Sequence, residues 1–298
     1  MKKLNVTLAI LVAAVMAGNA QTVTSEVVGY QTIAAAKGYT TLGFPLVNSP
    51  VVSGTVSSKT ASSIDLNLVC PSTVNPSMPY YLEVTSGPLA GERVDVSVTP
   101  GSATVGIVAS SGNTDTLSTL ANGASVVVRQ HVTLGQVDQS CSPALVAGDV
   151  NGDRVLFFIG GSFIAYFKDT DGLWYEDGGF DDMTNMPVRP GVGLLLQRKA
   201  NTATTVTQIG TVRSNKFARP YSAGYQVYAP AYPVDLTPDG MGATVANGWR
   251  ANSNASLADR ILTFTGGSFI SNFLDSSDNS WYEDGDADPY RKSDSASE

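Results

Sequence analysis

Two clusters of acidic residues are the part of the sequence best equipped for chemistry. They lie at residues 169–182 and 275–288, and each surrounds a Trp-Tyr-Glu-Asp-Gly stretch. Clustered carboxylates repel one another unless water or a cation screens them, and Ca²⁺ takes roughly six to eight oxygen ligands in adaptable geometry. The pattern therefore predicts bound calcium, against the alternative that Asp and Gly simply form turns on an acidic surface. The predicted calcium ligands are Asp169, Asp171, Glu176, Asp177, Asp275, Asp278, Glu283 and Asp284.

A third acidic stretch, residues 149–153, reads Asp-Val-Asn-Gly-Asp and resembles the start of a calcium-binding loop. The twelfth position of such a loop should be a bidentate Glu, and here it is Gly160. We therefore interpret this stretch as a turn that leads into the strand beginning at Arg154.

The aromatic pairs Trp174-Tyr175 and Trp281-Tyr282 are candidate ligand-binding residues. Neighbouring residues of a strand face opposite sides of the sheet, so one ring of each pair can be buried while the other is exposed. An exposed ring can stack on a sugar, whereas a core Trp beside a partly exposed Tyr is the structural alternative that we favour. Paired acids would also suit a glycosidase, but an enzyme seldom needs the same acidic cluster twice.

The sequence contains few residues for catalysis by histidine or cysteine. His131 is the only histidine, and it lies in an apolar, strand-like stretch that favours a structural role. Cys70 and Cys141 are the only cysteines. In an oxidising compartment they predict a disulfide, with two separately buried thiols as the alternative. We therefore expect no enzyme activity and no zinc site.

The N-terminus predicts export. Lys2 and Lys3 precede an apolar run over residues 4–16, and small residues follow, so residues 1–20 are predicted to be a signal peptide. The run is too short to span a bilayer, and no later stretch is long enough. Removing two of the 18 basic residues leaves 16 against 26 acidic ones, a formal charge of 16 − 26 = −10. Such a surface repels nucleic acid and anionic lipid, so we expect an extracellular, periplasmic or cell-surface protein without a membrane span.

An internal repeat organises the chain. Residues 154–182 (the first copy) match residues 260–288 (the second copy) at an offset of 106, which becomes 107 after Asp275. Each copy has an apolar run, Gly-Gly-Ser-Phe-Ile, an acidic loop and a Trp-Tyr stretch. Gly-Gly between two apolar runs predicts a β-hairpin, because its tight turn requires positive φ angles. In the first copy, residues 192–196 add a further strand after a Pro-Gly turn.

The repeat predicts the domain organisation. Residues 38–45 and 224–230 are a weaker match, each an aromatic strand that leads towards a copy and ends at proline. We expect a first β-module at residues 21–50 and 141–212 and a second at residues 213–298. Residues 51–140 are predicted to form an inserted, barrel-like β-domain with strands near residues 80–84, 93–98, 104–108 and 125–129. The predicted fold class is all-β, with antiparallel sandwich or barrel modules.

The second copy lacks a counterpart of the strand at residues 192–196. We interpret the sequence as a fragment truncated at its C-terminus. The alternative is that the open sheet edge accepts a strand from a neighbouring molecule.

Several stretches together resemble a family of uncharacterised, paralogous exported proteins of verrucomicrobial and related bacteria. They are residues 25–30, 80–91, 131–135 and 258–262, with the Gly-Gly-Ser-Phe hairpin. The resemblance covers nearly the whole chain after the signal peptide and implies export, but it supplies no activity or site residues. We expect a secreted or cell-surface structural or adhesive protein, stabilised by calcium, that assembles with itself or binds surface polysaccharide. The alternative is a carbohydrate-binding or, less readily, carbohydrate-cleaving module.

Overall fold

The computed structural model describes residues 26–109, 119–221, 223–265 and 268–285. Strands make up most of the regular structure, and every strand pairing is antiparallel. The all-β prediction is therefore confirmed. The predicted signal peptide lies outside the described residues. Within the described ranges, no helix has the length and apolar character needed to cross a membrane.

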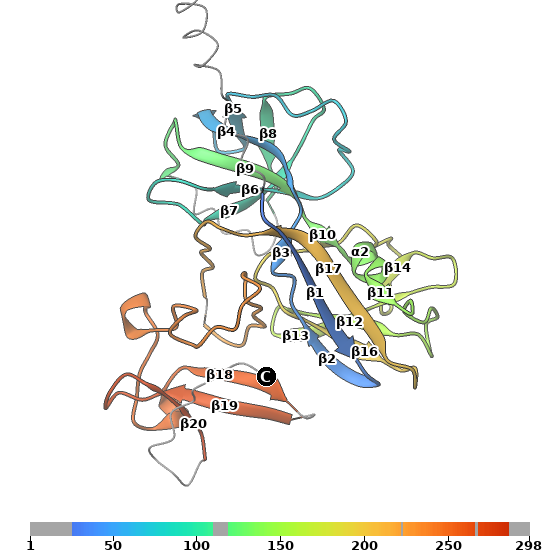
Figure 1. Ribbon diagram of the computed structural model, residues 1–298, viewed down its shortest axis with the longest axis vertical. Helices are drawn as coiled ribbons and strands as arrows, with labels where there is room; N and C mark the ends of the chain where they lie inside the picture. Colours follow the sequence, from blue (N-terminus) through green and yellow to red (C-terminus); the bar gives the residue numbers. More distant parts are fainter. Residues whose placement is uncertain (1–25, 110–118, 222, 266–267, 286–298) are drawn as a thin grey trace, which may run out of the picture.

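Six strands between Pro50 and Gln130 close into a barrel (Figure 1). Alternate side chains such as Val56, Ile64 and Leu82 point inward and are buried, as the two-residue period of a strand requires. In spatial order the strands are β4 (Pro50–Lys59), β5 (Ser63–Leu66), β8 (Thr104–Ile107), β7 (Arg93–Ser97), β6 (Tyr80–Val84) and β9 (Ser125–Gln130).

The chain leaves the barrel earlier than the sequence predicted. After β9 it forms β10 (Val132–Thr133) and the short helix α2 (Leu134–Gln139), whose N-terminus is closed by a capping box between Thr133 and Gln136. The fully buried Leu134 and Val137 pack into the core of the first module. The predicted boundary at residue 140 therefore assigned to the barrel a helix whose apolar side packs elsewhere.

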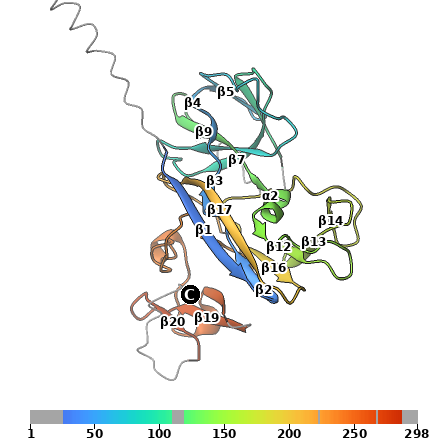
Figure 2. The same ribbon diagram turned by 45° about the vertical axis from the view of Figure 1, so that its right-hand side comes forward.

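The first module is built from two sheets with a shared core that includes Val155, Leu194 and Val206 (Figure 2). One sheet has the order β1 (Val28–Ala35), β17 (Thr204–Val212) and β11 (Cys141–Ser142), with β3 (Leu46–Val47) also paired to β17. The other has the order β14 (Trp174–Glu176), β13 (Ser162–Lys168), β12 (Arg154–Ile159), β16 (Leu194–Arg198) and β2 (Gly38–Leu42). A small ribbon pairs β10 with β15 (Pro187–Val188).

The second copy forms the sheet β18 (Arg260–Thr265), β19 (Ser268–Leu274) and β20 (Trp281–Glu283). Its register repeats that of the first copy: Arg260 lies opposite Phe273 as Arg154 lies opposite Phe167. The predicted duplicated hairpin is therefore confirmed. The segment before β18 is mostly irregular, with two short 3₁₀ turns, η2 (Val245–Asn247) and η3 (Ala255–Leu257).

The predicted strand at residues 224–230 is wrong. Its supposed counterpart forms β2, which pairs with β16 along five residues, whereas Tyr228 makes only an isolated bridge with Val192. The physical reason lies in the partner strand. β2 is held by β16, and among the described residues no strand occupies the corresponding position beside β18.

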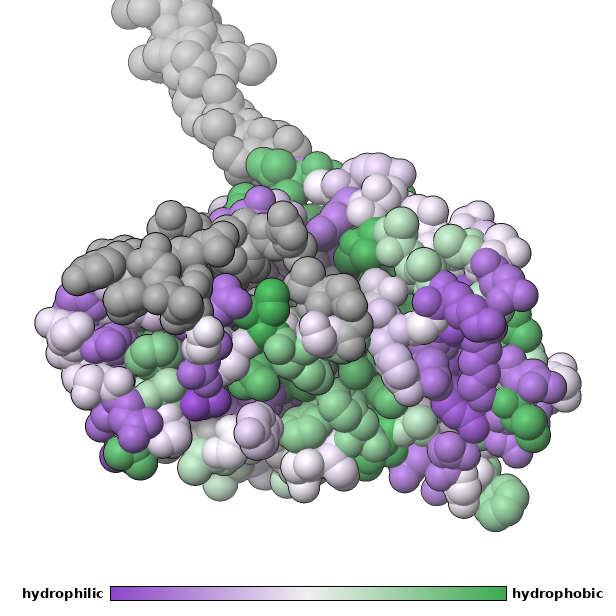
Figure 3. All heavy atoms as spheres, turned by 90° about the horizontal axis from the view of Figure 1, so that it is seen from below, coloured by the Kyte–Doolittle hydropathy of each residue, from purple (hydrophilic) through white to green (hydrophobic). Residues whose placement is uncertain are grey.

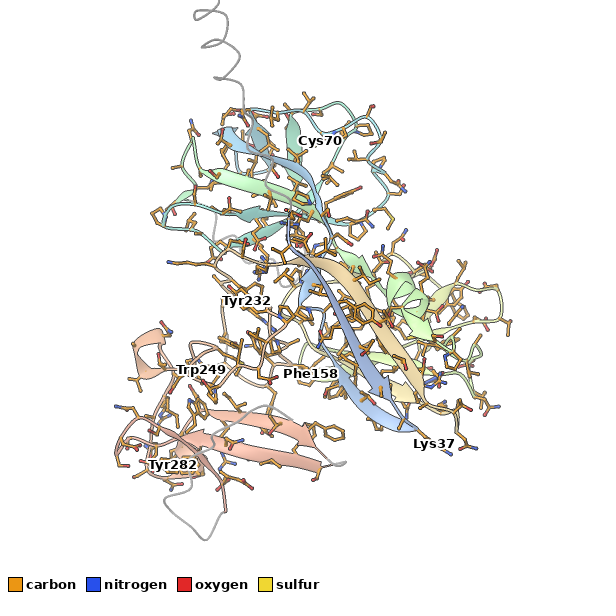
Figure 4. All side chains as sticks on the ribbon, in the orientation of Figure 1. Lys37, Cys70, Phe158, Tyr232, Trp249 and Tyr282 are labelled. Carbon is orange, nitrogen blue, oxygen red and sulfur yellow. The ribbon has the colours of Figure 1, made fainter. Side chains whose placement is uncertain are left out.

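The predicted disulfide is also wrong. Cys70 lies in the barrel core (Figure 4) and Cys141 lies in the core of the first module, and both thiols are free. Burial raises the pKa of Cys70 and raises that of Cys141 to about 11. The structure thus shows two separately buried thiols.

Candidate functional site

The two tryptophans of the repeat are core residues. Trp174 is 1% exposed and Trp281 is 4% exposed, so neither ring is open to a ligand. Trp281 packs against Trp249 with ring centroids 5.5 Å apart, beside the sheet of the second copy (Figure 4), and its indole N–H donates to the carbonyl of Ala243 at 3.0 Å. The structure therefore contradicts a direct ligand-binding role for Trp174 and Trp281.

The two tyrosines next to them lie on the opposite, outer side of each sheet and are half-buried. The Tyr175 hydroxyl donates to Asp171 Oδ2 at 2.8 Å, and the Tyr282 hydroxyl donates to Asp278 at the same distance. These bonds raise the pKa of both tyrosines. They also fix the orientation of each ring on the surface.

The remaining surface contacts of the first copy also recur in the second. Arg154 pairs with Asp177 at 3.3 Å and Arg260 pairs with Asp284 at 3.1 Å. Each tyrosine ring contacts a phenylalanine on the neighbouring strand, with centroids 6.2 Å apart for Phe167 and 6.4 Å apart for Phe273. We call this shared set of outward-facing side chains the outer face.

Each outer face ends at the Gly-Gly turn with an exposed phenylalanine. Phe163 is 40% exposed and Phe269 is 58% exposed. Each packs against a phenylalanine of the preceding strand, Phe158 or Phe264, with centroids 5.0 Å apart. In the first copy Gly160 and Gly161 have φ angles of +61° and +90°, as the hairpin prediction required. The protein thus presents the same aromatic surface twice.

The predicted calcium ligands are held by other contacts. Asp171 and Asp278 accept tyrosine hydroxyls, Asp177 and Asp284 pair with arginines, and Asp169 and Asp275 each accept a nearby backbone N–H at 2.7 Å. Glu176 accepts the Tyr166 hydroxyl at 3.4 Å, and Glu283 is exposed. Across the described ranges, no three His, Cys, Asp or Glu side chains gather in a geometry that would hold a metal ion.

His131 belongs to a hydrogen-bonded cluster, with Asp95 and Arg189, between the barrel and the first module. It is 2% exposed, and its Nε2 lies 3.0 Å from Asp95 Oδ1. Arg189 donates to the other oxygen of Asp95 at 2.7 and 2.9 Å. Burial lowers the pKa of His131, and the hydrogen bond to Asp95 offsets only part of that effect. The structural role predicted for this histidine fits its burial.

Two further buried ion pairs were not predicted from the sequence. Asp153 pairs with Arg198 and Glu83 pairs with Arg213, and all four side chains are almost completely buried. A usable signal was present in one of the strands, because Glu83 is a single charge in the otherwise apolar run at residues 80–84. Only the three-dimensional fold supplies the partners of Glu83 and Asp153, 130 and 45 residues away.

A shallow hollow of about 350 Å³ lies beside the barrel. Its lining includes Phe217, Arg219, Tyr228 and Tyr232. The Nη1 atom of Arg219 donates to the carbonyls of Gly191 and Val227, so this part of the guanidinium is bonded within the protein. The face of the molecule that contains the second copy has hydrophilic residues gathered on one side and hydrophobic residues over its middle (Figure 3).

No family model, curated protein or solved structure matches this chain. Its function is therefore inferred from the geometry of the repeat: two buried tryptophans that shape the sheets, and two outer faces with the same exposed aromatic and paired charged side chains.

Proposed function

We propose that this is an exported, non-enzymatic structural or adhesive protein that attaches to a repeating surface through its two outer faces. One observation carries the proposal: the second copy repeats the surface contacts of the first. The Phe163 and Phe269 rings, in particular, are exposed at the same position of both hairpins.

The repeated surface residues contribute little to the stability of the fold. Exposed ion pairs such as Arg260–Asp284 stabilise a protein by only about 0–1 kcal/mol, and exposed aromatic rings gain little from folding. Two equal faces on one chain, in contrast, raise the strength of attachment, because the second binding event becomes intramolecular. Bivalent attachment therefore explains why the outer face occurs twice.

The other parts of the proposal are supported by the burial of His131 and by the N-terminal sequence. A histidine that is 2% exposed cannot take a proton from a substrate in solvent. Residues 1–20 have the pattern of a signal peptide, and the charge of the chain is strongly acidic. Membership of the verrucomicrobial family of exported proteins is part of the same proposal and is supported by the stretches at residues 25–30 and 80–91.

The test measures adsorption to an envelope fraction from the organism that makes the protein. We expect Phe163→Ser or Phe269→Ser alone to weaken adsorption by about 10- to 100-fold, since one attachment point remains, and the double variant to abolish it. Phe180→Ser is the matched control: Phe180 is 95% exposed but has no phenylalanine counterpart in the second copy. Equal adsorption of the double variant and the control variant would contradict the proposal.

The second candidate function is carbohydrate binding, and the fixed tyrosine rings favour it. Tyr175 and Tyr282 are held in place on their sheets by Asp171 and Asp278, and an immobilised ring can stack on a sugar. A glycan array decides between the two functions. Binding that is lost in a Tyr175→Ala, Tyr282→Ala double variant supports a carbohydrate ligand, whereas an array without any bound glycan rejects it.

A further inference from the structure

The two copies differ at one edge of their sheets. In the first copy β12 has a partner on both sides, β13 and β16, with Val155 opposite Leu196 and Phe157 opposite Leu194. In the second copy β18 pairs with β19 alone among the described residues (Figure 1). Backbone N–H and C=O groups along Arg260–Thr265 therefore face an open edge, which is a template for a further strand.

The side chains behind this edge are also incompletely covered. Leu194 and Leu196 of β16 are fully buried and complete the core around Val155 and Phe157, both of which are buried. The counterparts in β18 are Ile261 and Thr263, which stay partly exposed. A strand with apolar residues at alternate positions would bury them as β16 buries the residues of β12.

An aspartate precedes each copy, and its negative charge indicates that such a strand should carry a positive charge. Asp153 accepts the backbone N–H of Val146 at 2.7 Å, and Asp259 accepts that of Arg250 at 2.8 Å in the same two-bond arrangement. Asp153 also receives the Arg198 guanidinium and the Lys199 N–H from the end of β16. Asp259 is exposed, and its Oδ1 has no hydrogen-bond partner in the described part of the chain.

We propose that the edge of β18 binds an extended segment of another polypeptide, antiparallel, with the pattern apolar-x-apolar-x-Arg. Its backbone pairs with Arg260–Thr265, its two apolar side chains cover Ile261 and Thr263, and its arginine pairs with Asp259. Within the described chain, Leu194–Arg198 has this pattern, and that segment is already bonded between β12 and β2. The donor in this proposal is a segment of a separate molecule. This inference goes beyond the proposed adhesion, because it concerns the sheet edge and not the outer faces.

The probe is a fluorescent peptide with the sequence of residues 191–199, Gly-Val-Gly-Leu-Leu-Leu-Gln-Arg-Lys. We expect saturable binding in fluorescence anisotropy and slower hydrogen exchange of the β18 amides. A peptide with Leu195→Pro is the matched control, because proline lacks the N–H of the ladder, and it should not bind. Absence of binding by the unmodified peptide, with unchanged exchange in β18, overturns the proposal.

A double-mutant cycle tests the arginine. We expect Asp259→Asn in the protein and Arg198→Gln in the peptide each to weaken binding about tenfold, and the combination to cost little more than either alone. Asp239→Asn, a change at another exposed aspartate before β18, should leave binding unchanged. Full additivity, or equal effects of Asp239→Asn and Asp259→Asn, overturns the Asp259–Arg pairing.

Two more measurements complete the test. The first distinguishes a strand donated by another molecule from occupation of the edge by the same chain. The second distinguishes binding at the sheet edge from binding at the outer faces. If a version ending at Gly285 binds the peptide and the full chain does not, residues 286–298 occupy the edge and donation by another molecule is wrong. The Phe163→Ser, Phe269→Ser variant should bind the peptide like the unmodified protein. Failure of the adhesion proposal and failure of this inference are therefore distinguishable.

Discussion

Single charged residues in the interior fix the connections between distant parts of the chain. Asp153 follows a Gly in a polar stretch whose pattern predicts a turn, but it is completely buried and pairs with Arg198. Sequence could not show this, because a turn depends on neighbouring residues and the ion pair depends on the packing of β16 beside β12. The repeat then offers a comparison inside one molecule, since Asp259 occupies the same position without the arginine.

This comparison gives a stability prediction. We expect Asp153→Asn to lower the free energy of unfolding by about 3 kcal/mol, because Arg198 would stay buried without its counter-charge. Asp259→Asn should lower it by less than about 1 kcal/mol, since that carboxylate is exposed and accepts the same type of backbone bond. Urea unfolding of both variants measures the difference, and equal losses would contradict a stabilising role for the buried pair.

At the scale of elements, the sequence predicted the hairpins, whose form depends on neighbouring residues. The Gly-Gly turn between two apolar runs in residues 154–168 predicted the β12–β13 hairpin, and the same signals predicted β18–β19. The strand expected at residues 224–230 failed because a strand needs a partner, and the partner of β2 is the non-local β16. The disulfide failed for a similar reason: the pairing assumed that Cys70 and Cys141 share a core, and the fold places them in two.

Calcium stabilisation of the two acidic loops stays a prediction from the sequence. We expect the melting temperature to be several degrees higher in Ca²⁺ than in a chelator, because a ligand that binds only the folded state stabilises that state. The structure provides the variant that tests it. Asp171→Asn and Asp278→Asn together should remove the calcium effect while the Arg–Asp pairs stay in place. Identical melting curves of the unmodified protein in Ca²⁺ and in chelator would reject the calcium hypothesis.

At the scale of the whole molecule, one partly buried and one buried ion pair connect the barrel with the first module. Asp95 belongs to the barrel strand β7, and Arg189 follows β15 of the first module. Burial alone would raise the pKa of Asp95, but the contacts with His131 and Arg189 lower it to about 2. Glu83 of the barrel pairs in the same way with Arg213, just after β17. The junction therefore depends on protonation states that two separate pH ranges can change.

The upper of these ranges belongs to His131. Its folded-state pKa is lowered by burial, and its buried Nδ1 has no hydrogen-bond partner among the described residues, so the folded protein takes up this proton less readily than the unfolded chain. Stability should consequently be complete above the unfolded pKa of about 6.5 and decrease as the pH falls from there towards the lowered folded pKa, by at most about 1.4 kcal/mol for each pH unit. Asp95 contributes a further loss only as the pH falls from about 4 towards 2, because its folded pKa is also lowered.

Urea unfolding at pH 7.5, 6.5 and 5.5 tests this prediction cleanly, since His131 is the only histidine of the chain. His131→Gln retains an N–H donor for Asp95 and has no proton to gain in this range. We expect its stability to be nearly constant from pH 7.5 to 5.5, while that of the unmodified protein decreases. A decrease of equal size in both proteins would show that the junction titrates through another group, and would remove His131 from its part in joining the barrel to the first module.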